Sequence, residues 1–160
     1  MRQGVRLGVD VGKVRVGIAR SDRDGLLATP VETVQRRGDD LDPVLARIAA
    51  IAAEVDAIEL VVGLPLALSG RETPSTADAR AVADRLADGP LPVRMVDERL
   101  TTVSAQSALH ASGRTTRGSR GVIEQVAAVI LLQHALDAER ARGEAPGALV
   151  EPKRREPGGP

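Results

Sequence analysis

The sequence predicts an α/β fold: a mixed sheet in which an antiparallel meander precedes parallel strands, with helices on both faces. Two observations predict it. The N-terminal part of the chain alternates apolar with polar or small residues at the period of strands, and the rest alternates short apolar runs with stretches at helical spacing. The expected order is therefore β-β-β-α-β-α-β-α-α. Ligands of such sheets gather outside the carboxyl ends of the parallel strands, and a functional site is expected there.

The meander is expected from three extended runs. A tight hairpin at Gly12-Lys13 joins the first two runs, and Asp24-Gly25 precedes the third. The runs cover residues 5–11, 14–21 and about 26–34.

Helix-start signals and apolar runs predict the remaining elements. Asp42 followed by Pro43 is an N-cap and first-turn signal, and apolar residues continue at helical spacing to Val55. Further helices are expected from Ser75 or Thr76 to about Asp88, from Thr101 or Thr102 to Ser112, and from Gly121 to about Arg142, with strands at Ile58–Gly63 and Pro92–Glu98 and a loop at 113–120.

Composition excludes several classes of protein. The chain of 160 residues has no cysteine and two histidines, which excludes disulfides, thiolate zinc sites, iron–sulfur clusters and a histidine metal cage. No apolar run approaches the ~20 residues of a membrane span, and the N-terminus lacks a signal-peptide core, so a cytoplasmic location is expected. One domain is expected over residues 1–142, followed by a disordered Gly/Pro-rich tail over 143–160.

Charge is balanced overall but uneven along the chain. Lys+Arg and Asp+Glu are 22 each, and aromatic residues are absent, so any nucleic-acid binding must use backbone contacts. The segment from Arg99 through Ile123 contains arginines and no acid, which suits phosphates; a solvated loop with incidental arginines is the alternative. The candidate nucleic-acid-binding residues are Lys13, Arg15, Arg99, Arg114, Arg117 and Arg120.

Three acids stand at element ends that this topology can bring together. They are Asp10, Glu98 and Glu124, and carboxylates without histidine or cysteine favour Mg²⁺ or Mn²⁺. Paired metals can activate water and stabilise the leaving oxygen of a phosphodiester. Each acid has a simpler explanation: Asp10 can prepare the turn, alternation lets only one of Asp97 and Glu98 face the site, and Glu124 can complement the helix dipole.

Four motifs carry a family resemblance: GVDVGKVRVGIARSD, VVGLPLALSG, VDERLTT and the helix beginning RGVIEQVAAVILLQHALD. Over residues 5 to about 140 they resemble, in order, the YqgF family of RuvX-type proteins, nucleases of precursor 16S rRNA that are similar to Holliday-junction resolvases. The resemblance implies an RNase H-like fold, in agreement with the element order, and metal-binding catalytic carboxylates at Asp10 and Glu98. The family's third carboxylate, usually Asp, falls on Glu124, and a further acid of some related resolvases is replaced by Ala127.

The expected function is that of a metal-dependent endonuclease acting on structured nucleic acid, with 5′-end maturation of 16S rRNA precursor favoured by the resemblance. Asp10 would bridge the metals, and Glu98 and Glu124 would complete the site. The substrate is structured RNA or branched DNA, no membrane is involved, and the protein is a monomer or homodimer. Three alternatives stay open: a Holliday-junction resolvase, a nucleic-acid-binding assembly or transcription factor with little catalysis, and an actin-like ATPase. The last is suggested by Asp10-Val11-Gly12, but it needs two such domains.

Overall fold

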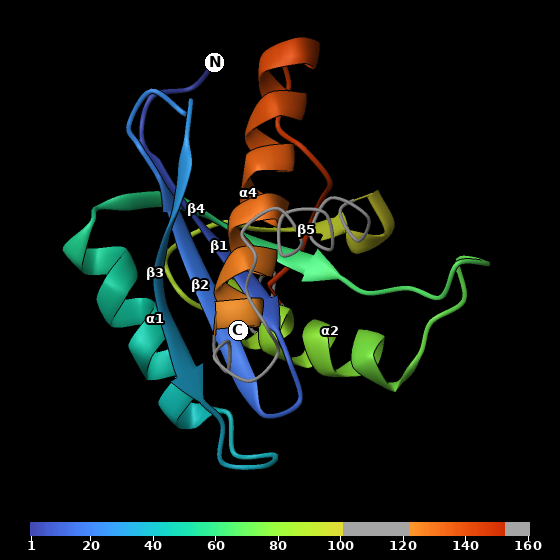
Figure 1. Ribbon diagram of the computed structural model, residues 1–160. Helices are drawn as coiled ribbons and strands as arrows, with labels where there is room; N and C mark the ends of the chain where they lie inside the picture. The colour runs from blue at the N-terminus through green and yellow to red at the C-terminus, as the bar shows by residue number, and fades with distance from the viewer. Residues whose placement is uncertain (101–121, 153–160) are drawn as a thin grey trace, which may run out of the picture.

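The computed structural model describes residues 1–100 and 122–152. Within them the strands form one six-stranded sheet in the order β3-β2-β1-β4-β5-β6 (Figure 1). Strands β1, β2 and β3 are antiparallel, β4 and β5 run parallel to β1, and β6 is antiparallel to β5. The strands are β1 (Val5–Val11), β2 (Arg15–Ser21), β3 (Ala28–Gln35), β4 (Ala57–Leu64), β5 (Val93–Asp97) and β6 (Ala148–Leu149). The helices are α1 (Asp42–Glu54), α2 (Pro74–Ala87) and α4 (Val122–Arg142), with a 3-10 turn η1 (Glu98–Leu100) directly after β5.

The mixed sheet and its meander confirm the predicted fold class. Two helix starts differ from expectation. Leu41 rather than Asp42 is the N-cap of α1, and it makes no side-chain capping hydrogen bond. Thr73 caps α2, where it forms a reciprocal capping box with Thr76, so the helix begins at Pro74. Among the described residues, no helix is long and apolar enough to cross a membrane.

The two faces of the sheet carry different residues. On one face, Leu7 and Ile18 belong to an aliphatic core beneath α1 and α2. On the other face, Gly8 and Gly17 let α4 approach the strands closely, and Figure 1 shows the helix lying across them. A Cβ at Gly17 would lie 2.1 Å from the backbone oxygen of Glu124. The first turn of α4 is therefore fixed directly against β2.

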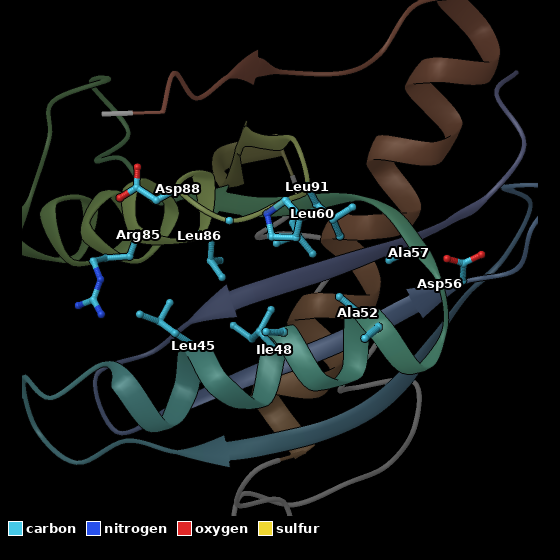
Figure 2. Close-up of a pocket in the computed structure, with 14 residues that line it drawn as sticks. Leu45, Ile48, Ala52, Asp56, Ala57, Leu60, Arg85, Leu86, Asp88 and Leu91 are labelled. Atoms are coloured by element: carbon cyan, nitrogen blue, oxygen red, sulfur yellow. The ribbon is translucent and has the colours of Figure 1, made fainter. Parts of the chain in front are cut away.

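The aliphatic core between α1 and α2 is open on one side. A groove of about 510 Å³ separates the two helices, and Figure 2 shows Leu45, Ile48 and Leu86 pointing toward one another across it. Its lining does not include the three acids of the predicted site, so the groove is separate from that site.

The segment after α4 differs from the expected disorder where it is described. β6 pairs with β5, and the N–H of Val150 donates to the carbonyl of Val93 over 2.8 Å. Gly147, at a φ of 67°, permits the approach, since a Cβ there would lie 2.2 Å from the Met95 oxygen. The pairing satisfies backbone groups that the edge of β5 would otherwise leave unpaired. Outside the described residues lie 101–121 and 153–160, which include the expected helix ending at Ser112 and the loop 113–120.

A buried ionic cluster joins α4 to the N-terminal ends of β1, β4 and β5. Arg6 and Glu139 are 1% and 4% exposed, and Arg6 Nη2 donates to Glu139 Oε2 over 3.0 Å. Arg2 contacts Glu139 at 2.6 Å and Glu59 at 3.0 Å, and Arg94 donates to Glu59 over 2.9 Å. Alternation places Arg6 on the polar side of β1, but α4 covers that side, so its charge needs a buried partner.

We expect Glu139→Gln to lower the free energy of unfolding by about 3 kcal/mol at neutral pH, because it leaves Arg6 buried without its counter-charge. Arg2, which hydrogen-bonds this carboxylate, lowers the pKa of Glu139 from 4.5 to about 2. An acid whose pKa is depressed by folding stabilises the fold above its unfolded value, and that stabilisation is lost as pH falls to the folded value. Between pH 4.5 and 2 the parent should therefore lose stability more steeply than the variant, as measured by chemical denaturation. Asp137→Asn is the control, because Asp137 makes only exposed contacts, with Gln133 and Arg140, and the change should alter stability by under about 1 kcal/mol. Equal losses in both variants would contradict the account.

Candidate active site

Asp10 lies near the carboxyl end of β1, on the face that α4 covers. Side chains alternate along a strand, so Asp10 shares this face with Gly8, whose Cα lies against α4. Its register partner on β2 is Gly17, which contacts the backbone of Glu124. The strand therefore presents the Asp10 carboxyl beneath the first turn of α4.

Glu98 follows β5 as the first residue of η1. A Cβ at Gly63, in the neighbouring strand β4, would lie 2.1 Å from Glu98 Oε1, so the Glu98 carboxyl occupies the space that a side chain at this position would fill. Asp97 is turned elsewhere and pairs with Arg99 at 2.6 Å. Of the two adjacent acids, the structure thus brings Glu98 into contact with Asp10.

Glu124 lies in the first turn of α4. Its Oε2 atom is buried and has no hydrogen-bond partner among the residues that the structure describes. Gly12, just beyond the end of β1, lies beside it: a Cβ at that position would be 3.7 Å from Glu124 Cγ. The third predicted acid therefore faces the same region as the other two. It does so from α4, whereas Asp10 and Glu98 come from the strand ends.

The electrostatics of the site follow from burial and crowding of like charges. Burial raises the pKa of Asp10, and the charge of Glu124 raises it further, against a hydrogen bond from Glu98 that lowers it. Burial and the hydrogen bond with Asp10 raise the pKa of Glu98 to about 9. In the absence of a cation, the Asp10–Glu98 pair therefore holds one proton at neutral pH.

These residues fit a divalent cation in chemistry and surroundings. All three offer oxygen donors, the ligands that Mg²⁺ and Mn²⁺ prefer. Among the described residues the buried Oε2 of Glu124 has no partner and is therefore available as a donor, and Gly63 and Gly12 lie against the side chains of Glu98 and Glu124. As the side chains stand, no three acidic or histidine residues in the described part of the chain converge closely enough to hold a metal. Binding of one cation by all three carboxyls therefore requires these side chains to move closer together.

The basic candidates are only partly placed by the structure. Lys13 is exposed in the hairpin, and Arg15 is half-buried at the start of β2. Arg99 is exposed, but its guanidinium contacts Asp97 and the carbonyl of Leu68. The described residues thus place no cluster of free arginines beside the acids; Arg114, Arg117 and Arg120 lie outside them.

Sequence reasoning missed Arg36, which follows β3 and reaches the site region. Its side chain is 4% exposed, and its guanidinium binds the carbonyl of Gly12 and the carboxylate of Asp78. An arginine directly after a strand has the sequence signature of an exposed residue. Its burial becomes visible only when the hairpin and α2 are both in place.

Comparisons with known proteins agree with this geometry. A family model described as RuvX, Holliday junction resolvase, matches residues 4–138. A protein of Clavibacter michiganensis subsp. michiganensis named "Putative pre-16S rRNA nuclease" is 62% identical over 98% of both chains, and a protein of the same name from Streptomyces coelicolor is 52% identical over 94% of this chain and 90% of the relative. Among solved structures, Thermus thermophilus RuvC superposes with a TM-score of 0.56 over 91% of this chain and 99% of RuvC, at 15% identity. RuvC in complex with a Holliday-junction substrate gives a TM-score of 0.55 at the same identity, over 92% of this chain and 99% of RuvC. The RuvC likeness supports the RNase H-like fold.

Proposed function

The chain belongs to the RuvX family, and on that basis we propose that it is a metal-dependent endonuclease that hydrolyses phosphodiester bonds of structured nucleic acid in the cytoplasm. The names of its relatives support precursor 16S rRNA as the substrate. The observation that carries the proposal is the group of three half-buried carboxyls, in which Asp10 and Glu98 are hydrogen-bonded and Glu124 has a buried oxygen with no partner among the described residues. A cluster of like charges on a covered face costs stability, which favours a role in binding a cation.

Asp10, Glu98 and Glu124 would hold the cation. A bound Mg²⁺ or Mn²⁺ supplies water activation and charge stabilisation at the leaving oxygen of the phosphodiester. The protein's part begins with Glu98, whose proton must leave when the carboxyls become ligands. Glu124 contributes an oxygen already removed from water, and Gly63 keeps the space that Glu98 occupies. In the hydrolysis the water oxygen bonds to phosphorus and the bond to the 3′ oxygen breaks, giving 5′-phosphate and 3′-hydroxyl ends.

We assign binding of the nucleic-acid backbone to the six basic residues that the sequence singles out. These are Lys13, Arg15, Arg99, Arg114, Arg117 and Arg120. Because the chain lacks aromatic side chains, phosphate contacts would carry affinity in place of base stacking.

Replacing Arg114, Arg117 and Arg120 together with Ala should weaken binding and flatten its dependence on salt. Each lost phosphate contact lowers the slope of log K against log salt by roughly 0.7–0.9. Titrations of a fluorescent structured RNA at several salt concentrations measure the slope. The matched control removes three arginines that are ion-paired on the surface, Arg47, Arg80 and Arg85. An unchanged slope in the first variant would show that this segment does not bind phosphates.

The substrate is tested by offering precursor 16S rRNA and a four-way DNA junction to the same preparation, with and without Mg²⁺ or Mn²⁺. Cleavage of the rRNA alone, only with metal, is the expected result. The family description and the RuvC likeness favour a Holliday junction as the second candidate, and cleavage of the junction alone would select it. Binding without any cleavage would select a non-catalytic nucleic-acid-binding protein.

A further inference from the structure

We propose that the N-terminal turns of α2 position the two backbone segments that lie beside the catalytic carboxyls. Asp78 of α2 acts through Arg36 on the hairpin after Asp10, and Thr76 of α2 acts on the end of β4 beside Glu98. This assignment of positioning residues rests on the nuclease function proposed above. None of these side chains touches the reacting atoms in our account. They act through the two backbone segments that carry or confine Asp10 and Glu98.

The first set of hydrogen bonds, made by Arg36, holds the hairpin that follows Asp10. Arg36 Nη1 donates to the Gly12 carbonyl over 2.8 Å, and the Arg36 backbone N–H donates to the Val14 carbonyl over 2.9 Å. The guanidinium also makes two hydrogen bonds to the carboxylate of Asp78 on α2, one of them at 3.0 Å. The turn two residues beyond Asp10 is thus linked through one buried side chain to the helix.

The second set of hydrogen bonds, made by Thr76, holds the backbone just after β4, beside Glu98. Thr76 is fully buried, and its hydroxyl accepts from the Thr73 N–H over 2.9 Å and donates to the Pro65 carbonyl. Pro65 lies two residues after Gly63, the glycine whose Cα faces the Glu98 carboxyl. The capping box of α2 therefore also fixes the backbone wall against which Glu98 rests.

Both sets of hydrogen bonds involve residues of the same helix, Thr76 and Asp78. We infer that α2 sets the spacing between the hairpin after Asp10 and the end of β4. The helix is anchored by buried aliphatic side chains in the core under the sheet, at Ala79, Val82, Ala83 and Leu86. Catalytic geometry tolerates errors of only about 0.5 Å, and a displacement near 1 Å can cost about 100-fold in rate. Arg36 itself is a poor candidate for binding phosphate, because it is 4% exposed and its charge is matched by Asp78.

The test compares three variants with a matched control. Thr76→Val keeps the volume and removes the hydroxyl, whereas Thr76→Ser keeps the hydroxyl. Arg36→Lys keeps the charge but cannot reach Gly12 and Asp78 together. Arg47→Lys is the control, since Arg47 makes a similar forked pair with Glu32 on the surface, away from the site.

Three quantities are measured well below the unfolding temperature of each variant: kcat and KM for the cleaved substrate, and the affinity for Mn²⁺ alone by titration calorimetry. We expect Thr76→Val and Arg36→Lys to lower kcat about 3–10-fold, with KM nearly unchanged and Mn²⁺ binding weakened. Thr76→Ser and Arg47→Lys should match the parent. A merely structural role would lower the unfolding temperature and leave kcat and Mn²⁺ affinity of the folded protein unchanged.

The positioning role is overturned if the parent cuts and binds Mn²⁺ while Thr76→Val and Arg36→Lys do both equally well. Failure of the nuclease proposal gives a different result: the parent itself neither cuts nor binds Mn²⁺, and the positioning role then falls with it.

Discussion

Asp10→Asn is expected to lower metal-dependent cleavage at least about 100-fold while the fold stays intact. The substitution removes a charged ligand from a group of three and replaces it by an amide of nearly the same shape. The metal-free variant should be at least as stable as the parent, because partial burial and the nearby charge of Glu124 disfavour the charged form of Asp10 and raise its pKa. Cleavage rates over a Mg²⁺ titration and thermal unfolding of the same samples measure both effects.

The control for this variant is Asp24→Asn, an exposed acid in the turn before β3. It should change neither the cleavage rate nor its dependence on Mg²⁺. Asp10→Asn cutting at the parent's rate would remove Asp10 from the site.

Glu124→Gln is expected to lower metal-dependent cleavage at least tenfold and to shift the unfolding temperature little. The free, buried oxygen of Glu124 is offered to the cation, and an amide oxygen is a weaker, uncharged ligand. Glu124→Asp should keep measurable activity with a changed preference between Mg²⁺ and Mn²⁺, since it shortens the reach by one methylene. Rates are compared over titrations of both metals.

If Glu124 only complements the helix dipole, a different result is expected for these variants. A dipole role is nearly indifferent to side-chain length, and the charge is worth under about 1 kcal/mol. Asp42→Asn, which neutralises the acid in the first turn of α1, is the matched control and should leave cleavage unchanged. If Glu124→Gln cuts as fast as the parent at every metal concentration, only the dipole role survives.

Much of the fold could be predicted because the spacing of apolar residues is regular along most of the strands and helices. The alternation over residues 5–11 predicts β1 with the bounds that the structure gives, Val5–Val11. β6 could not be predicted, because its two residues lie in a Gly/Pro-rich segment and pair only to satisfy the edge of β5. The spacing of polar residues also does not show whether a polar face of a strand or helix meets solvent or another element. The burial of Arg6 on β1 and of Glu139 on α4 could therefore not be predicted.

The site shows the same division. Sequence named the three acids, and the structure places them around one region. Strand alternation alone could not choose between Asp97 and Glu98, and the family resemblance selected Glu98. Alternation fails here because β5 ends at Asp97 and the chain turns into η1. The choice depends on the space that Gly63 leaves on the neighbouring strand, a contact between segments distant in sequence.

Proton release on metal binding tests the central claim most directly. With the pKa of Glu98 raised to about 9, the metal-free pair holds a proton at pH 7.5 that a cation must displace. Mn²⁺ titration calorimetry at about pH 7.5, in two buffers that differ in ionisation enthalpy, counts that proton. We expect about one proton released per site, an affinity that rises as pH increases toward 9, and loss of the release in Glu98→Gln. Binding of Mn²⁺ with the same affinity and the same proton release in Glu98→Gln as in the parent would contradict the assignment of this carboxyl cluster as the metal site.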